Sequence, residues 1–404
     1  MPPRYLKVVR ESHDLVIVGA GAAGNAVARW LEGVDALVID RKREIGKPVE
    51  CAGLISKRTL ELFEFDRDSW FIQNEIYGAY IHSPKGKTYH IGGDGVHAYA
   101  IDRSGLERSM AEIARKKGVD YLLNTKVEEA YREGNKIVLR MKEREVETSI
   151  AIGADGIDSV IRRSFFQQEP EEVLFGIGVE VEGIDVDPRN VHVFFGNKLA
   201  PGFFAWIIPT DRNGKRGRAG LCRPSTISKN PRSMLHDLFN YPTTREYLED
   251  AEVVEVMAGR IPLGYMKESV KDNLILIGDS AFQVKPLSGG GLYPIAEASK
   301  ICSRVVLGAL ERRIFDNRIL KRYHEGWSSK LKREILFGML IRRKYLGMKD
   351  EDIEDMLSYL EREDVLEVIN RYGDMDHPSR LVYPLARRMP ILLSLLPKII
   401  GFFL

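Results

Sequence analysis

The pattern of apolar and polar positions begins with a strand, a helix and a second strand. Residues 15–18 form a short apolar run rich in β-branched side chains, which is typical of a buried parallel strand. Apolar residues between positions 26 and 31 then recur at helical spacing, and residues 36–39 form a second apolar run that ends at Asp40. This order predicts a parallel strand–helix–strand unit at the start of the chain.

Beyond this unit the pattern predicts a changing mixture of strands and helices. Residues 56–70 favour a helix, and Ser104 is expected to cap another that ends at Gly118. Residues 230–250 also favour helix, and from residue 293 onward the pattern is almost entirely helical. Further strands are predicted at residues 77–83, 88–91, 121–124, 127–131, 177–181, 191–195, 205–209, 218–222 and 273–277.

The turn after the first strand carries the motif GxGxxG, written GAGAAG at positions 19–24. Gly19 allows the tight turn, Gly21 lets the backbone approach a pyrophosphate, and Gly24 lets the helix pack closely on the strand. The helix N-terminus offers free N–H groups to the phosphate, and Asp40 can bind the ribose hydroxyls. We therefore predict a dinucleotide site, although the motif does not separate NAD from FAD.

Together, the pattern and the motif predict an α/β (α+β) fold. A Rossmann-like nucleotide-binding domain is expected to be interleaved with an antiparallel-sheet domain, and helices follow. The predicted boundaries are 1–75, 98–165 and 270–310 for the nucleotide-binding domain, 76–97 and 166–269 for the sheet domain, and 311–404 for the helical C-terminal region.

Composition narrows the possible classes of protein. The 404 residues carry a net charge of +2, so no overall field favours nucleic acid as a partner. Three widely spaced cysteines and eight scattered histidines show no metal-binding or disulfide pattern, so we assign no metal and expect a reduced, cytoplasmic setting. No apolar run reaches the roughly 20 residues of a transmembrane helix, and no signal peptide is expected at the first residues.

Two further motifs lie downstream of the first. Ala154-Asp155-Gly156 is followed by Ser159 and Arg162, and Gly278-Asp279-Ser280 is followed by a glycine-rich loop after Pro286. With GxGxxG and its acid, these motifs resemble those of FAD-dependent oxidoreductases with the para-hydroxybenzoate hydroxylase fold. The resemblance covers about residues 13–310 and implies non-covalent FAD as the cofactor.

The resemblance also implies where the cofactor would lie. Asp279 would approach the ribityl chain, and residues 289–292 would direct backbone N–H groups toward the isoalloxazine and stabilise its anionic reduced form. Arg103 would lie near the pyrophosphate and Val127 near the adenine, whereas Arg41 is either a solvated turn residue or lies over the adenine or the phosphates. The expected cofactor-binding residues are Gly19, Ala20, Gly21, Ala23, Gly24, Asp40, Arg41, Cys51, Ala52, Gly53, Arg103, Val127, Ala154, Asp155, Gly156, Gly278, Asp279, Gly289, Gly290, Gly291 and Leu292.

Two segments look like those of geranylgeranyl reductases. Residues 47–53, KPVECAG, are similar to the Pro-x-x-Cys-Gly segment of that family, and residues 201–209, PGFFAWIIP, are similar to its Pro-x-x-Tyr-x-Trp-x-Phe-Pro segment. This chain departs from the pattern at Ala52, Phe204 and Ile208, which keeps the segments apolar but leaves the substrate open. The resemblance implies hydrogenation of prenyl C=C bonds in archaeal membrane lipids, with the substrate lined by Pro201, Phe203, Phe204, Trp206 and Pro209.

Two other interpretations remain open. Residues 204–209 also nearly match the Trp-x-Trp-x-Ile-Pro segment of flavin halogenases, so a monooxygenase or halogenase of the same fold is an alternative. A non-catalytic flavin redox sensor is another. The 201–209 segment alone is equally consistent with a core strand that carries one tryptophan.

Reduction of an unactivated alkene needs a hydride and a proton. Cys51 is the one cysteine in a segment expected beside the flavin, so we assign it as a candidate proton donor or gate; the alternative is a small buried apolar residue. No second GxGxxG appears after residue 60. The expected electron donor is therefore external: reduced ferredoxin, NAD(P)H or another carrier.

The C-terminal segment has a composition of its own. Residues 377–404 contain no Asp or Glu, carry Arg380, Arg387, Arg388 and Lys398, and end in PILLSLLPKIIGFFL. This composition suits peripheral contact with anionic lipid on the inner face of the cell membrane. A helix packed on the protein itself is the alternative.

Overall fold

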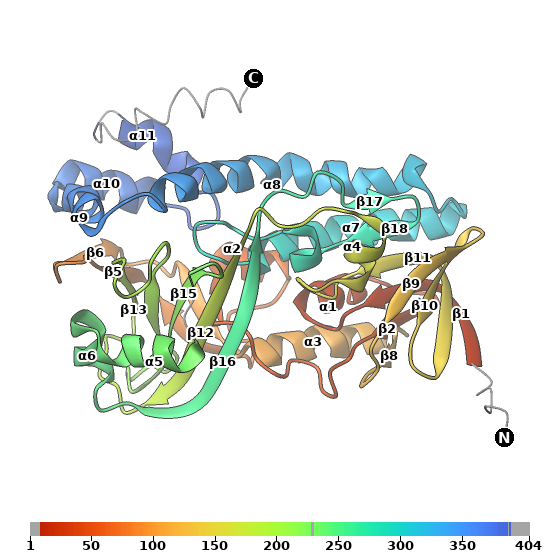
Figure 1. Ribbon diagram of the computed structural model, residues 1–404, viewed down its shortest axis with the longest axis horizontal. Helices are drawn as coiled ribbons and strands as arrows, with labels where there is room; N and C mark the ends of the chain where they lie inside the picture. Colours follow the sequence, from red (N-terminus) through yellow and green to blue (C-terminus); the bar gives the residue numbers. More distant parts are fainter. Residues whose placement is uncertain (1–8, 228–229, 387, 389–404) are drawn as a thin grey trace.

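A computed structural model describes residues 9–227, 230–386 and 388 (Figure 1). A large sheet lies at each end of the molecule, and the long helix α8, Asn317–Tyr345, runs above both of them. Helix α7, Leu292–Arg312, lies directly beneath α8. Within the described residues, none of the helices combines the length and the apolar character that crossing a membrane requires.

The first sheet is the one predicted to bind a nucleotide, and it has the strand order β17-β18-β11-β1-β2-β8. Strands β18, β11, β1, β2 and β8 run parallel, while β9 and β10 form an antiparallel extension paired to β11. Its strands are β1 (Val9–Val18), β2 (Ala36–Ile39), β8 (Asp120–Leu122), β9 (Glu129–Glu133), β10 (Lys136–Arg140), β11 (Arg144–Gly153), β17 (Val270–Lys271) and β18 (Leu274–Leu276).

The second sheet has seven strands in the order β16-β12-β15-β14-β13-β5-β6. Neighbours are antiparallel, with one parallel pair between β13 and β5. Its strands are β5 (Gly78–His82), β6 (Thr88–Gly92), β12 (Glu172–Glu182), β13 (Asn190–Phe194), β14 (Ala205–Pro209), β15 (Arg216–Pro224) and β16 (Glu252–Leu263). Helices α5 (Pro231–Asn240) and α6 (Pro242–Leu248) bury Met234, Leu238 and Leu248 against this sheet.

A small third sheet and short helices complete the fold. The sheet joins β3 (Leu54–Ser56), β7 (Ala98–Ile101) and β4 (Ile72–Ile76) in that order. The remaining helices are α1 (Ala22–Ala28), α2 (Lys57–Leu62), α3 (Arg103–Lys116), α4 (Val160–Phe165), η1 (Gly278–Ala281), α9 (Asp350–Ser358), η2 (Tyr359–Glu361), α10 (Glu363–Tyr372), η3 (Pro378–Leu381) and α11 (Val382–Ala386). Helices α9 to α11 gather at the same end of the molecule as β5 and β6 (Figure 1).

The predicted fold class is confirmed, whereas several local predictions were wrong. Helix α2 ends at Leu62 rather than near residue 70, because Glu64 adopts a positive φ of 52° that a helix cannot continue through. Asp102, not Ser104, is the N-cap residue of α3, and Ser104 is buried inside the first turn. Strand β9 begins at Glu129, which leaves Val127 in the preceding loop.

Strand β16 was missed altogether. It lies at an edge of the seven-stranded sheet, and its side chains at Val253, Val254 and Val256 are about half exposed. An apolar–polar alternation therefore does not mark its buried face, and the enrichment in β-branched residues was the signal to follow.

Candidate functional site

The predicted motifs meet at one edge of the nucleotide-binding sheet. Val18 at the end of β1 is in register with Ile39 of β2 and with Gly153 of β11, and Gly153 is in register with Leu276 of β18. The residues that follow these strands therefore emerge side by side. Strands β2 and β11 pair with opposite edges of β1. Such a switch in strand order opens a crevice at the carboxyl ends of the strands.

A cavity of about 710 Å³ opens at this crevice and is called the cofactor cavity below. Its wall combines glycine turns, carboxylates and cationic side chains. The predicted cofactor residues that line it are Gly19, Gly21, Ala23, Asp40, Arg41, Cys51, Arg103, Val127, Ala154, Asp155, Gly156 and Asp279.

The three glycines of GxGxxG occupy different environments. A Cβ at Gly24 would lie 1.8 Å from the carbonyl oxygen of Gly19, so this position must lack a side chain for the helix to begin. Gly19 has φ +109°, and a Cβ there would lie 2.3 Å from the Ala154 oxygen. Gly21 has nothing within 4 Å of the Cβ position and borders the cofactor cavity. The first and third glycines thus shape the turn, while the second leaves space for a close ligand.

Asp40 is held in place at the end of β2 by two backbone N–H groups. Ala20 N–H donates to Oδ2 over 2.5 Å, and Lys42 N–H donates to Oδ1 over 2.7 Å. The carboxylate is 8% exposed and borders the cavity. Each oxygen retains a further lone pair, so hydroxyl groups in the cavity can donate to it.

Arg103, Cys51 and Asp279 form the electrostatic centre of the cavity. Burial opposes the charge of Arg103, but the neighbouring Glu107 and Cys51 side chains raise the pKa of the guanidinium above its ordinary value. Arg103 Nη1 lies 2.6 Å from Glu107 Oε1. Burial raises the pKa of Asp279 to about 6; the nearby Arg103 charge opposes this shift and Glu50 adds to it.

These features fit a dinucleotide with a pyrophosphate. Among the described residues, Nε of Arg103 is buried and lacks a hydrogen-bond partner. Gly156, like Gly21, has open space where a Cβ would lie and borders the cavity. A buried cationic donor facing a cradle of bare backbone is suited to an anionic ligand.

Other predicted cofactor residues stand behind the cavity wall or apart from it. A Cβ at Gly53 would lie 2.4 Å from Arg218 Nη1, and one at Gly278 would lie 2.6 Å from the Ala23 side chain, so these glycines serve close packing. Ala20 acts through its hydrogen bond to Asp40. The predicted residues that do not line the cavity are Ala20, Gly24, Ala52, Gly53, Gly278, Gly289, Gly290, Gly291 and Leu292.

The glycine-rich loop, residues 285–291, lies next to the cofactor cavity. Lys285 N–H donates to the Gly290 oxygen over 3.0 Å and Gly289 N–H donates to the Lys285 oxygen over 2.9 Å, so the loop closes on itself. A Cβ at Gly291 would lie 3.4 Å from Oδ1 of Asp279, which lines the cavity. Gly291 is also the N-cap residue of α7.

The predicted substrate residues cluster on and before β14. Phe203 and Phe204 stack with ring centroids 4.3 Å apart, and a Cβ at Gly289 would lie 3.6 Å from the Phe203 ring. Pro201 lies in the preceding turn, and Pro209 ends the strand, where its oxygen accepts a hydrogen bond from Asn74. None of the five lines the cofactor cavity or the second cavity described next, and their role in binding substrate stays a prediction.

A second cavity, called the apolar cavity, has a volume of about 660 Å³. Its wall is mostly hydrocarbon, with charged groups on α2 and on residues 374–376. Trp206 packs in the cluster of Ile76, Ala98 and Val191, so it supports this wall from behind without lining the cavity. The apolar side chains of the wall are Leu54, Ile76, Ala79, Ile91, Val96, Ala98, Val191, Ile369, Met375 and Leu381.

Several cavity residues escaped the sequence reasoning. Ala258, Gly259 and Arg260 on β16 bring the seven-stranded sheet to the cofactor cavity, and Glu107 lines it one helical turn after Arg103. The position of Glu107 was the available signal, because an acid four residues after a predicted phosphate-binding arginine lies on the same helix face. Because strand β16 was not predicted, the sequence offered no way to place Ala258, Gly259 and Arg260 at the cavity.

The chain matches the FAD binding domain family over residues 12–325. It is 30% identical to an uncharacterized protein of Methanocaldococcus jannaschii, over 95% of this chain and 97% of that protein. It is 29% identical to digeranylgeranylglycerophospholipid reductase 2 of Methanothermobacter thermautotrophicus, over 91% and 98%. It is 27% identical to digeranylgeranylglycerophospholipid reductase 1 of Methanococcoides burtonii, over 86% and 87%.

Solved structures share the fold. A geranylgeranyl bacteriochlorophyll reductase-like protein of Thermoplasma acidophilum superposes with a TM-score of 0.84 at 19% identity, over 96% of this chain and 100% of that one. The halogenase PltM in complex with phloroglucinol and FAD superposes with a TM-score of 0.69 at 14% identity, over 93% and 92%. At these identities the likeness shows the fold alone.

Proposed function

The chain belongs to the FAD binding domain family, and from that premise we propose that it is an FAD-dependent reductase that hydrogenates prenyl C=C bonds of membrane lipids. FAD is its cofactor. Relatives at 27–29% identity are named digeranylgeranylglycerophospholipid reductases, which supports geranylgeranyl lipids as the substrate class.

One observation carries the proposal: residues that are close together in the sequence line the polar cofactor cavity and the apolar cavity. Cys51 lines the cofactor cavity, and Leu54, three residues later at the start of β3, lines the apolar cavity. A hydrocarbon chain gains free energy from such a wall at roughly 25 cal/mol per Å² of buried surface. The arrangement thus supports a substrate with a long apolar chain and a reacting bond near the flavin.

The residues of the chain supply binding, exclusion of water and a proton. When bound, the reduced flavin supplies a hydride to one carbon of the alkene. Cys51 is the proposed donor of the proton to the other carbon, and a hydrogen bond of 3.4 Å from Gly53 N–H supports a fixed position for the sulfur. The apolar wall keeps water away from the reacting bond, which limits loss of reducing equivalents to solvent.

An anaerobic assay tests the proposal directly. The protein is loaded with FAD, reduced chemically, and mixed with digeranylgeranylglyceryl phospholipid or geranylgeranyl diphosphate. We expect flavin reoxidation together with mass gains of two hydrogens for each double bond. Flavin that stays reduced with both lipids, but turns over with oxygen to give a hydroxylated or halogenated product, would favour the monooxygenase or halogenase alternative. Failure with every acceptor would favour the redox sensor.

We propose an external electron donor and a peripheral membrane contact as well. A reduced ferredoxin, NAD(P)H or another carrier would reduce the flavin, and stopped-flow reduction with each in turn would identify the donor.

The basic apolar segment ending at residue 404 supports the membrane contact, although residues 389–404 lie outside the described part. Deleting residues 389–404 should weaken binding to anionic vesicles, because it removes the apolar end and Lys398. Added salt should weaken it as well, because salt screens the attraction of Arg387, Arg388 and Lys398 to the lipid. Unchanged vesicle binding after the deletion would refute the contact.

A further inference from the structure

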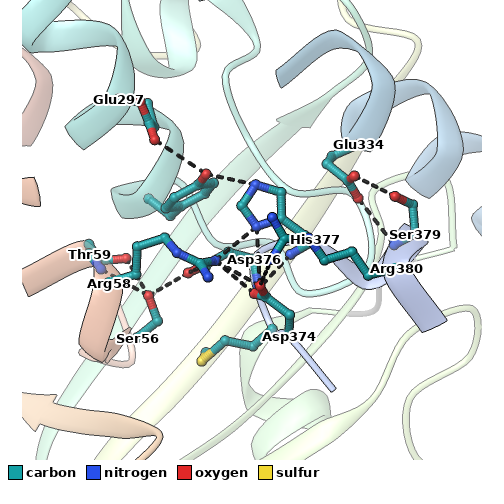
Figure 2. Close-up of polar contacts among 12 residues, drawn as sticks. Ser56, Arg58, Thr59, Glu297, Glu334, Asp374, Asp376, His377, Ser379 and Arg380 are labelled. Carbon is teal, nitrogen blue, oxygen red and sulfur yellow. Dashed lines mark hydrogen bonds and ion pairs between the residues drawn. The ribbon is translucent and has the colours of Figure 1, made fainter. Parts of the chain in front are cut away.

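A short C-terminal segment, residues 374–377, lies between the glycine-rich loop and the apolar cavity. Asp374, Met375 and Asp376 line that cavity. Figure 2 shows Asp374, Asp376 and His377 converging with Ser56 and Arg58 of the β3–α2 region. Ser56 Oγ donates to Asp376 over 2.5 Å, and Arg58 donates to Asp374 over 2.8 Å.

The same segment binds the glycine-rich loop through Lys285. Its ammonium donates to Asp376 Oδ1 over 2.8 Å and to the Met375 oxygen over 3.1 Å. The side chains of Asp376 and Lys285 are 1% and 13% exposed, so this ion pair is largely shielded from solvent. A shielded pair with further hydrogen bonds holds a defined geometry more firmly than a surface pair does.

The contacts continue from the loop to the cofactor cavity. Gly291 lies close to Asp279, since a Cβ at this glycine would be 3.4 Å from Oδ1 of Asp279, which lines that cavity. Just after the loop, the Tyr293 hydroxyl and Nε2 of His377 are 3.0 Å apart, which ties the first turn of α7 to the same segment. These contacts lead from the wall of the apolar cavity through Asp376, Lys285 and the loop to the neighbourhood of Asp279.

We propose that Asp376 is a positioning residue: through Lys285 it fixes the glycine-rich loop, so that a ligand in the apolar cavity changes how firmly the protein holds reduced FAD. The ligand part of this inference rests on the proposed function. An apolar chain that packs against Met375 restrains the 374–377 segment, and the segment restrains Lys285. The loop then holds Gly291, the N-cap residue of α7, close to Asp279, so that the N-terminus of this helix stays in place beside the cofactor cavity. Coupling between two ligands is reciprocal, so binding of reduced FAD would also raise the affinity of the apolar cavity for its ligand.

Positioning is tested first, without any lipid. The variant combines Lys285→Met with Asp376→Asn, which removes both charges and leaves no buried ion unpaired. The matched control combines Lys87→Met with Glu361→Gln, because this variant also removes an ion pair of 2.8 Å but neither residue lines a cavity or contacts the glycine-rich loop. In hydrogen exchange on the FAD-loaded protein, amides of residues 285–292 should exchange at least about tenfold faster in the double variant and at the wild-type rate in the control. Equal rates in all three proteins would overturn the positioning role.

Coupling is tested with phytanol, a saturated isoprenoid alcohol that has the proposed apolar chain but cannot be reduced. In the wild type it should raise the ratio of reduced to oxidised FAD affinity by about tenfold, which is about 30 mV in the midpoint potential of a two-electron couple. The double variant should lose this shift, and the control variant Lys87→Met with Glu361→Gln should keep it. An equal shift in the double variant would overturn the route through Lys285. If phytanol does not bind the wild type, the proposed lipid site fails and so does the coupling, whereas the exchange rates still decide the positioning role.

Discussion

The cofactor cavity and the apolar cavity are assembled from the chain in different ways. Most of the cofactor cavity comes from turns that directly follow parallel strands, such as Gly19 after β1 and Asp40 after β2. The apolar cavity combines β3, β4, β5, β6, β7 and β13 with α2, α10 and η3, so its wall runs from Leu54 to Leu381. Each part of the cofactor cavity is therefore formed by a short stretch of sequence. The apolar cavity forms only when elements that are distant in sequence pack together.

This difference separates two kinds of constraint on sequence. A turn that must bring bare backbone to a ligand demands glycine at set positions, because a side chain would collide with the backbone. An apolar wall demands only hydrocarbon of suitable volume, and many residue types supply it. Substitutions should therefore act sharply and all-or-none at the cofactor cavity, and in proportion to volume at the apolar cavity.

The largest effect is expected at Gly24. The change Gly24→Ala would place a Cβ 1.8 Å from the Gly19 oxygen, so the turn between β1 and α1 must open. We expect loss of FAD retention and a fall in the free energy of unfolding of at least about 3 kcal/mol. Absorbance of the purified protein at the flavin bands and urea unfolding measure the two.

Gly21→Ala in the same motif is the control for this prediction. The space at its Cβ position is open, so the free energy of unfolding of the FAD-free protein should change by less than about 1 kcal/mol. FAD binding should still weaken, because the methyl group enters the cofactor cavity. If the two variants behaved alike, the distinction between a packing glycine and a ligand-facing glycine would be wrong.

The second effect comes from the buried carboxylate of Asp279. Its folded pKa of about 6 lies above the ordinary 3.8, so in the FAD-free protein the charged carboxylate costs stability above pH 6 and none below pH 4. Asp279→Asn removes that cost. The stability of the variant relative to wild type should therefore rise between pH 4 and pH 8, by at most about 3 kcal/mol. A relative stability that stays constant across this range would show that Asp279 is not desolvated in solution.

How far the sequence could predict the structure follows the same division. Local motifs predicted the first sheet and many of the residues that line the cofactor cavity, because each motif is short and sterically strict. These motifs are GxGxxG, Asp40 and the segments 154–156 and 278–280. The apolar cavity was not predicted, since neither Ala79 nor Ile369 carries a local signal of its role. Residues 201–209 were assigned to the substrate, yet Trp206 packs behind the wall of the apolar cavity. A resemblance in pattern does not fix which face of a strand meets the cavity.

The third effect concerns Cys51, which lies where the two cavities approach each other along the chain. Cys51→Ala should leave FAD bound but slow single-turnover reoxidation of the reduced flavin by a prenyl lipid about 100-fold, or about 2.7 kcal/mol, because the proton donor is lost. Flavin reduction should be unaffected and serves as the internal control. Equal reoxidation rates for variant and wild type would remove Cys51 from the mechanism.

The smallest effect, and the sharpest test of the apolar cavity, is expected at Ala79 on β5. Ala79 is half-buried and lines the cavity, so Ala79→Phe adds a ring to a wall that is already hydrocarbon. A pocket that loses room for part of a chain should bind prenyl lipid about tenfold more weakly, or about 1.4 kcal/mol. FAD retention should stay at the wild-type level, because no residue of β5 lines the cofactor cavity.

Tyr80→Phe is the matched control for Ala79, since neighbouring residues of a strand point to opposite faces and the Tyr80 hydroxyl donates to Asp187. It should leave the KM for lipid unchanged, and a KM series with substrates of decreasing chain length separates the two variants further. In Ala79→Phe the penalty should shrink as the chain shortens, because a short chain does not reach the added ring. A penalty independent of chain length, or one shared with Tyr80→Phe, would mean that the variant perturbs the sheet and that the prenyl chain lies elsewhere.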